Sequence, residues 1–247
     1  MAFRAVFCVA LCAGVAVAQF PNPTSTKKVP ATIQVKKGVP FDGKNVRHTA
    51  GFADGSQKEG QPPIFKLEDG AVIRNVVIGA PAADGIHCQG SCTIENVWWE
   101  DVGEDAATFR GGNDVKVTIT GGGAKKASDK VFQHNGGGTV TIRNFQVEDF
   151  GKLYRSCGNC GCNYKRNVVI ENVKAKGPAK NIAGVNYNCG DTATLKNIQV
   201  SGKVNFVCET YKDNGSGTEP TGGKQYKVGQ DGDGKQCIYK AADIKSA

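Results

Sequence analysis

Short β-branched segments recur along this chain, and five of them end in the same phrase: an aliphatic residue, any residue, Asn and an apolar residue. The asparagines of this phrase are separated by 21, 48, 28 and 25 residues, and the interval of 48 accommodates two units, with the segment 115–119 between them. They are Asn75, Asn96, Asn144, Asn172 and Asn197. No long stretch shows the 3.6-residue apolar period of an amphipathic helix. Repeated strands without intervening helices predict an all-β fold, a right-handed single-stranded parallel β-helix, or β-solenoid.

One coil of this repeat is too small to bury its own apolar face, so successive coils must stack. Asparagines at the same corner of each coil can form a ladder of amide hydrogen bonds, and Gly, 33 of 247 residues, supplies the positive φ of tight corners. The alternatives are a leucine-rich repeat, whose L-x-x-L-x-L pattern is missing, and a β-sandwich with strands roughly 8–12 residues apart. We expect one domain over 19–247, with a loop-rich cap near 20–65 and an irregular tail after about 208.

The first 18 residues have the pattern of a secretory signal peptide. Arg4 precedes an apolar run over 5–17, and Ala16-Val17-Ala18 is a small-x-small cleavage motif. The run is shorter than the ~20 residues of a bilayer span. Cleavage would leave 229 residues beginning at Gln19, with eight Cys and a formal charge of +7. We therefore predict a secreted, extracellular protein without a membrane anchor, and Asn214-Gly215-Ser216 is an N-glycosylation acceptor triplet.

Eight cysteines in an oxidising compartment indicate up to four disulfides. Cys88 with Cys92 is the only pairing that we assign, because it closes a small loop between two extended segments. The alternative is a zinc site on Cys157, Cys160 and Cys162, but the chain has no second C-x-x-C motif.

Acidic residues fall between the repeats at intervals of about one coil. Asp84 follows the first repeat, and Glu104 and Asp105 follow the second, 20 and 21 residues later. Their carboxylates should therefore lie at similar positions on adjacent coils. Three carboxylates at a surface make a hard-oxygen site that suits Ca²⁺. The alternative is that they are ordinary turn residues that accept hydrogen bonds from backbone amides.

Basic residues follow the same spacing. Lys130 and Lys152 are 22 residues apart, so we expect them to stack beside the carboxylates, although a surface Lys is ordinarily a solvated charge.

His87 and His134 are interpreted as neutral histidines satisfied in turns. Of Trp98 and Trp99, one ring should face the core and the other should face outward, where it either stacks on a sugar or packs.

Four phrases at these positions resemble a known family: A-D-G-I-H at 83–87, D-V-G-E-D-A at 101–106, a segment over 121–136 that contains A-S-D-K-V-F-Q-H-N-G, and D-F-G-K-L-Y-R-S-C-G-N-C at 149–160. They are similar to motifs of the polysaccharide lyase family 3 pectate lyases, and the resemblance covers about 29–208. It implies a right-handed parallel β-helix, Ca²⁺ dependence and eliminative cleavage of polygalacturonate.

The resemblance also implies roles for single residues. Asp84, Glu104 and Asp105 match the calcium ligands, Lys130 matches the proposed Brønsted base, and Asp129, Lys152 and Arg155 match residues that line the substrate groove. Glu59 occupies a position like that of an active-site Glu, over a short local match. Arg155 also suits a catalytic role, because its guanidinium pairs bidentately with a carboxylate and keeps its proton.

The charge of +7 fits an acidic polymer, because a basic groove concentrates a polyanion. Nucleic acid is the other polyanion, but nothing in the sequence resembles an aromatic stacking platform or a groove-reading helix. We expect polygalacturonate as the partner, no nucleic acid, no membrane and a monomeric protein. The alternatives are a β-helical hydrolase with paired carboxylates and a binding protein without activity.

A lysine that acts as a base must be neutral, although its ordinary pKa is ~10.4. We expect Lys152, Arg155 and bound Ca²⁺ to lower the pKa of Lys130, because nearby positive charge disfavours the ammonium form. An alkaline optimum of activity follows from this expectation. Asp129 acts in the opposite direction, so it either orients Lys130 or contacts the metal or the substrate.

Overall fold

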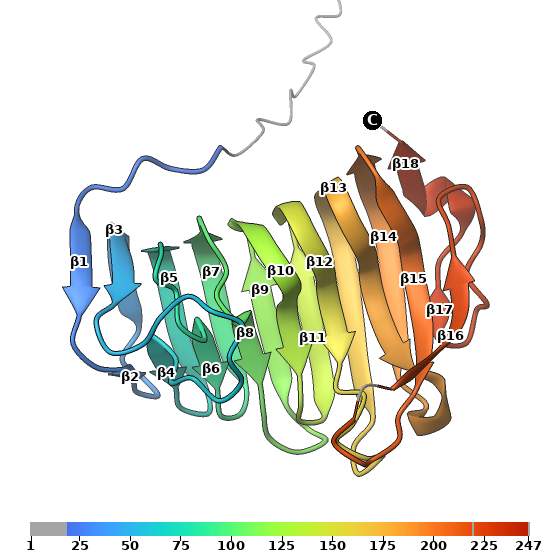
Figure 1. The fold of residues 1–247 in the computed structure, drawn as a ribbon, viewed down its shortest axis with the longest axis horizontal. Coiled ribbons are helices and arrows are strands. Elements are labelled where there is room, and N and C mark those ends of the chain that lie inside the picture. Colours follow the sequence, from blue (N-terminus) through green and yellow to red (C-terminus); the bar gives the residue numbers. More distant parts are fainter. Residues whose placement is uncertain (1–18, 219, 247) are drawn as a thin grey trace, which may run out of the picture.

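The structure is a computed structural model that describes residues 19–218 and 220–246. The signal peptide predicted over 1–18 lies outside the described residues. Within those residues the regular structure is almost entirely β (Figure 1). Among them, no helix is long and apolar enough to cross a membrane.

The strands run in chain order from one end of the molecule to the other (Figure 1). They are β1 (Thr26–Val29), β2 (Ile33–Val35), β3 (Phe41–Ala50), β4 (Phe65–Leu67), β5 (Ala71–Ile78), β6 (Ile86–Cys88), β7 (Cys92–Trp99), β8 (Asp105–Phe109), β9 (Lys116–Thr120), β10 (Gly123–His134), β11 (Gly138–Arg143), β12 (Gln146–Ser156), β13 (Arg166–Asn186), β14 (Thr192–Ser201), β15 (Val204–Lys212), β16 (Thr221–Tyr226), β17 (Cys237–Ile238) and β18 (Ile244–Ser246). Two 3-10 turns accompany them, η1 (Tyr187–Cys189) and η2 (Ala241–Asp243).

Parallel pairing between successive coils arranges these strands into three faces. The first, which we call the groove face, contains β2, β4, β6, β8, the second halves of β10 and β12, the end of β13, and β15. The second face begins with the start of β3 and ends with β17, and the third begins with β1 and ends with β18. The chain is therefore the parallel β-helix that the repeat predicts.

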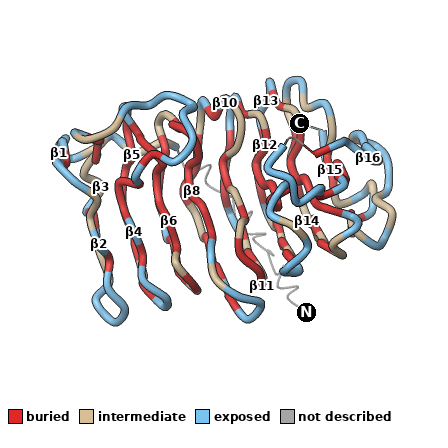
Figure 2. The backbone as a smooth tube through the Cα atoms, turned by 60° about the horizontal axis from the view of Figure 1, so that its bottom comes forward, coloured by how far each residue is buried: buried red, intermediate tan, exposed pale blue. Residues whose placement is uncertain are grey.

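Aliphatic and aromatic side chains from all three faces fill the interior. Figure 2 shows that buried residues follow the strands of the middle coils, whereas exposed residues gather at the turns and on the terminal strands β1 and β16. Ile73, Ile94, Ile119, Ile142 and Ile170 follow one another in register along the second face, and each is fully buried. The apolar positions of the repeat thus form a continuous core, as stacking of coils requires.

The repeated asparagines turn the chain from the second face to the third. All five have φ between 50° and 55°, in the left-handed region that Asn tolerates better than most residues. Asn96 donates to Asn75 at 2.8 Å, Asn172 to Asn144 at 3.3 Å, and Asn197 to Asn172 at 2.8 Å. The predicted ladder is present, but in two parts, because Gly121 occupies the corner between Asn96 and Asn144.

Both ends of the domain are more regular than expected. The predicted loop-rich cap near 20–65 is wrong in part, because β1, β2 and β3 pair in parallel with the strands that follow. The predicted irregular tail after 208 is also wrong in part. β15 continues to Lys212 and pairs antiparallel with β16, while β17 and β18 both pair with β14. This hairpin covers part of the last edge of the groove face, which would otherwise expose unpaired backbone groups.

The described residues hold four disulfides, and the predicted pair Cys88–Cys92 is one of them. The other three are Cys157–Cys160, Cys162–Cys189 and Cys208–Cys237. The alternative of a zinc site does not agree with this pairing, because the sulfurs of Cys157, Cys160 and Cys162 all belong to disulfides.

The tryptophan pair is only partly as expected. Trp99 is fully buried in the core. Trp98 lies on the other side of β7, but it is only 3% exposed, because Phe20 packs against it with ring centroids 4.9 Å apart. Its indole nitrogen donates to Asn96 at 2.7 Å. The ring therefore has a packing role, and the alternative of a sugar platform is wrong.

Candidate active site

A cavity of about 700 Å³ opens on the groove face, and all eight residues singled out in the sequence line it. They are Glu59, Asp84, Glu104, Asp105, Asp129, Lys130, Lys152 and Arg155. Its walls come from the loops that leave the coils. Residues 59–63 form one wall, and residues 157–160 with Gly217 and Pro220 form another. Six neighbouring positions that the sequence reasoning did not single out also line it: Gln61, Thr108, Arg110, Gln133, Asn135 and Asn159.

Three carboxylates meet at one end of the cavity. Asp84 precedes β6, while Glu104 and Asp105 stand at the start of β8 on the next coil. One ligand atom from each lies within 4.8 Å of the others, and the residues are 5%, 6% and 2% exposed. Burial, together with the neighbouring carboxylates of Asp84 and Glu59, raises the pKa of Glu104 to about 7. Burial and the carboxylates of Glu104 and Asp84 likewise raise the pKa of Asp105 well above its ordinary value.

The atoms of this cluster fit a divalent cation. Asp84 Oδ1 and Asp105 Oδ1 are buried and accept no hydrogen bond. Asp84 is oriented by His87, whose Nε2 lies 2.6 Å from Oδ2, so that the other oxygen is left to the cluster. Closely spaced carboxylate oxygens that accept no hydrogen bond are the ligands that Ca²⁺ prefers. His87 was expected to lie in a turn, and this placement is wrong, because it lies on strand β6 and contacts Asp84.

Lys130 lies beside the carboxylates because β10 pairs with β8 in register, Lys130 opposite Asp105. Its Nζ is 3.2 Å from Glu104 Oε1, 3.5 Å from Asp105 Oδ1 and 2.8 Å from Asp129 Oδ2. Burial by itself would lower the pKa of Lys130, but the carboxylates of Asp105, Asp129 and Glu104 raise it above its ordinary value. Among the side chains alone, the expected lowering of this pKa is therefore wrong.

Asp129 sits in an irregularity of strand pairing. Three residue steps of β10, from Ala127 to Lys130, face two steps of β12, from Phe150 to Lys152. Such a β-bulge re-aims a side chain, and here the carboxylate of Asp129 contacts both Lys130 and Lys152. Burial alone would raise the pKa of Asp129, but the two ammonium groups hold it below its ordinary value. As predicted, Lys130 and Lys152 lie in register on adjacent coils.

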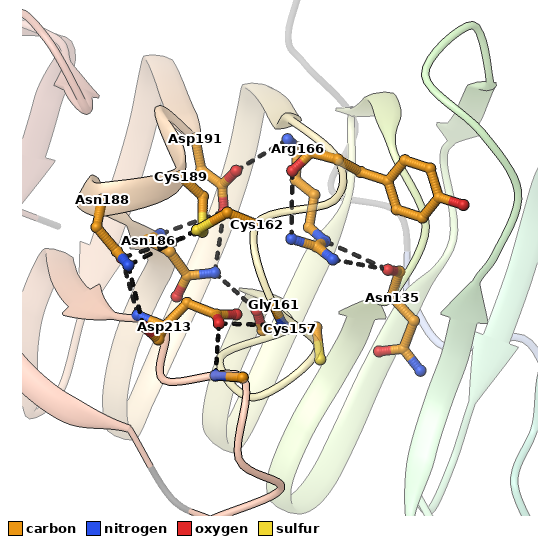
Figure 3. The surroundings of a disulfide bond; sticks show 12 residues. Asn135, Cys157, Gly161, Cys162, Arg166, Asn186, Asn188, Cys189, Asp191 and Asp213 are labelled. Carbon is orange, nitrogen blue, oxygen red and sulfur yellow. Dashed lines mark hydrogen bonds between the residues drawn. A yellow bond between two sulfur atoms is a disulfide. The ribbon is translucent and has the colours of Figure 1, made fainter.

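Arg155 lies three residues after Lys152 on β12 and is only 4% exposed. Its Nη1 donates to Asn186 Oδ1 at 2.9 Å and to the backbone carbonyl of Ser156. Asn186 is itself held by Asp191 and by the carbonyl of Cys157, next to the Cys162–Cys189 disulfide (Figure 3). The guanidinium is thus fixed at the cavity wall by a buried polar network.

His134 is buried beneath the groove face. Its Nδ1 lies 2.8 Å from the Tyr154 hydroxyl and its Nε2 lies 3.0 Å from the Gly137 carbonyl. Burial lowers the pKa of His134 to about 4. The histidine is therefore neutral and satisfied, as interpreted, although it ends a strand rather than lying in a turn.

The protein is a parallel β-helix whose flank carries buried carboxylates, two lysines and a fixed arginine, a charged groove of the kind that suits an extended acidic polymer. Comparison with known proteins specifies the family. The family model for pectate lyases matches residues 17–218. The chain is 44% identical to probable pectate lyase E of Neosartorya fischeri, over 90% of this chain and 85% of that protein. It is 45% identical to pectate lyase H of Emericella nidulans, over 89% and 83%.

Solved structures agree. The catalytic domain of pectate lyase PelI from Erwinia chrysanthemi is 31% identical, with a TM-score of 0.71 over 87% of this chain and 100% of that chain. PelI in complex with tetragalacturonic acid is 34% identical, with a TM-score of 0.69 over 86% and 70%. The chain belongs to the pectate lyase family, and it is an enzyme of the polysaccharide lyase type.

Proposed function

We propose that this protein is a secreted, calcium-dependent pectate lyase. It cleaves α-1,4-polygalacturonate by β-elimination at internal linkages of the polymer. The observation that carries the proposal is the contact between Lys130 and the carboxylates of Glu104 and Asp105 in one cavity. It brings a candidate base against a candidate metal site. Paired carboxylates alone would suit a hydrolase, but here a lysine contacts both of them.

The substrate is supported by charge and by one relative. Polygalacturonate carries one carboxylate per sugar, and Lys130, Lys152 and Arg155 present three cationic groups to the cavity. The related PelI was solved in complex with tetragalacturonic acid. A groove on the open flank of a solenoid also admits a polymer at any point along its length, which supports endo action.

In the proposed reaction, neutral Lys130 takes the proton from C5 of a galacturonate unit. The electrons of the C5–H bond form the C4–C5 double bond, and the bond from C4 to the glycosidic oxygen breaks. The leaving oxygen takes a proton from water, and the product is a 4,5-unsaturated end. Arg155 is suited to pair with the C6 carboxylate, where negative charge increases as the proton leaves.

We infer that Asp84, Glu104 and Asp105 hold the calcium ion. Bound calcium would neutralise Glu104 and Asp105, two of the three carboxylates that retain the proton of Lys130, and would withdraw charge from the substrate carboxylate. Asp129 remains hydrogen-bonded to both lysines, so we assign it the role of orienting Lys130. Lys152 and Glu59 are assigned to the substrate groove, whose lining they share.

Secretion and a monomeric state complete the proposal. Four disulfides in about 230 described residues are typical of proteins made in an oxidising compartment. The experiment that tests the function compares two signals from polygalacturonate. A lyase produces ultraviolet absorbance of the unsaturated end together with reducing ends, a hydrolase produces reducing ends alone, and a binding protein produces neither. A rapid fall of viscosity early in the reaction would support endo action, whereas slow loss would contradict it.

A further inference from the structure

The guanidinium of Arg155 lies over the ring of Tyr211, with Cζ 3.9 Å from the ring centroid. Both residues are buried, 4% and 2% exposed. They come from coils that are not adjacent, because Arg155 on β12 pairs with Gly184 on β13, and Gly184 pairs with Glu209 on β15. The ring of Tyr211 therefore reaches across one coil to meet the guanidinium.

Gly184 makes this stacking possible. A Cβ at position 184 would lie 3.0 Å from Arg155 Cδ and 3.0 Å from Tyr211 Cε2, closer than packed side chains ordinarily approach. The absence of a side chain on the intervening coil leaves a gap on the groove face, and the arginine and the tyrosine fill it together. Gly158 also leaves room for the guanidinium, since a Cβ at position 158 would lie 2.2 Å from Arg155 Nη2.

The ring is itself held in place. The Tyr211 hydroxyl donates to Glu209 Oε2 at 2.5 Å, and Asn181 Nδ2 donates to the same oxygen at 2.8 Å and to the hydroxyl at 3.2 Å. Gln225, on the covering strand β16, donates to Glu209 Oε1 at 2.9 Å. Tyr211 thus packs against the guanidinium, and Asn186 holds it by a hydrogen bond.

We propose that Tyr211 is a positioning residue for the reaction: its ring holds the guanidinium of Arg155 in the orientation that meets the substrate carboxylate. The inference rests on the role proposed for Arg155. A long, flexible side chain that is stacked and hydrogen-bonded beforehand loses little further freedom when it engages a carboxylate. A cation over a desolvated aromatic ring is attracted by the negative face of the ring. The ring, which contacts the guanidinium, should therefore matter more for turnover than the hydroxyl, which acts only by helping to hold the ring.

The test compares two substitutions at Tyr211 with a control. Tyr211→Phe keeps the ring and should keep kcat within about threefold, whereas Tyr211→Leu should lower kcat by about tenfold or more with KM changed by less than about threefold. Tyr239→Leu removes another buried tyrosine of the C-terminal coils, away from the cavity, and should leave kcat unchanged. Equal loss of kcat in Tyr211→Phe and Tyr211→Leu, or an equal loss in the control, would overturn the proposal.

A second variant tests the same contact in case Tyr211→Leu does not fold. Gly184→Ala keeps the ring but inserts a methyl group between it and Arg155 Cδ, and it should lower kcat in the same way as Tyr211→Leu.

A double-mutant cycle with Arg155→Ala separates this proposal from the proposed function. Tyr211→Leu should have no further effect on kcat in the Arg155→Ala background. If Arg155→Ala lowers turnover and Tyr211→Leu has its full effect in both backgrounds, the positioning role is wrong while the role of Arg155 stands. If Arg155→Ala leaves turnover unchanged, both roles are wrong.

Discussion

Lys130 Nζ lies 3.2 Å from Glu104 Oε1, so the side chain proposed as the base touches a side chain proposed to bind calcium. The contact exists because Glu104 ends a turn directly before β8, and the pairing of β8 with β10 places Lys130 opposite Asp105. If calcium binds as proposed, lysine and metal compete for the same carboxylates. A change at Lys130 should therefore also change the binding of the metal.

Lys130→Ala should lower turnover by about a hundredfold or more, because loss of a general base typically costs that much. Calcium should bind at least as tightly as in the wild type, since an ammonium group no longer competes for Glu104. Product absorbance and isothermal titration measure the two effects. Lys116→Ala, an exposed lysine on the second face, is the control for loss of one charge. Turnover near that of the control would refute the assignment of the base.

Asp105→Asn should weaken calcium binding by about tenfold or more, because it removes one of three charged ligands. In the wild type, added calcium should raise the melting temperature, since a ligand that binds only the folded state stabilises it. The variant should lose most of this rise. Asp101→Asn lies four residues away and outside the cavity lining, and it should respond as the wild type does. An equal rise in Asp105→Asn would show that calcium binds elsewhere.

The pH dependence of stability should contain a contribution from His134. Burial holds its folded-state pKa at about 4, below the ordinary value of ~6.5 in an unfolded chain. The unfolded state thus binds an extra proton between these values, so this contribution is complete above pH 6.5 and falls as the pH drops toward 4. The loss is about 2–3 kcal/mol by pH 4.5. Urea unfolding at pH 7.5 and 4.5 should show a smaller difference for His134→Gln than for the wild type, and an equal difference would contradict this.

Gly121→Asn should stabilise the protein by joining the two parts of the asparagine ladder. Gly121 has φ of 67°, and a Cβ there would meet no atom closer than 3.9 Å. Hydrogen bonds to Asn96 and Asn144, with a less flexible unfolded chain, should contribute about 1 kcal/mol, or about 2–4 °C in melting temperature. Gly121→Ala places a side chain at the same positive φ but adds no amide to the ladder, so it should not raise the melting temperature. A lower melting temperature in Gly121→Asn would show that the ladder does not extend.

Much of the solenoid could be predicted because its corner residue is repeated. The Asn phrase marks the turn from the second face to the third, and its spacing also places Asp84 one coil from Glu104 and Asp105. The first coils were missed because the corner before Val46 is formed by Lys44 and Asn45, both with positive φ, without the repeated phrase.

Contacts across coils were the part that the sequence could not indicate. Tyr211 meets Arg155 only because Gly184, in register with Arg155 on the intervening coil, has no side chain, and no local pattern in the sequence indicates such a gap. Phe20 covers Trp98 on the side of β7 that faces away from the core, and the spacing of the repeat does not indicate this contact. The pKa of Lys130 was misjudged for a similar reason, because Asp129 was considered as an opposing charge but the direct contacts of Lys130 with Glu104 and Asp105 were not.

The central claim is that elimination at this groove depends on calcium held beside Lys130. The most direct test measures ultraviolet absorbance of unsaturated product from polygalacturonate with chelator-treated wild-type protein, while calcium is returned in steps. The account predicts no absorbance after chelation, and full recovery with calcium, with reducing ends that rise in equal number. Reducing ends without absorbance, or absorbance that chelation leaves unchanged, would contradict it.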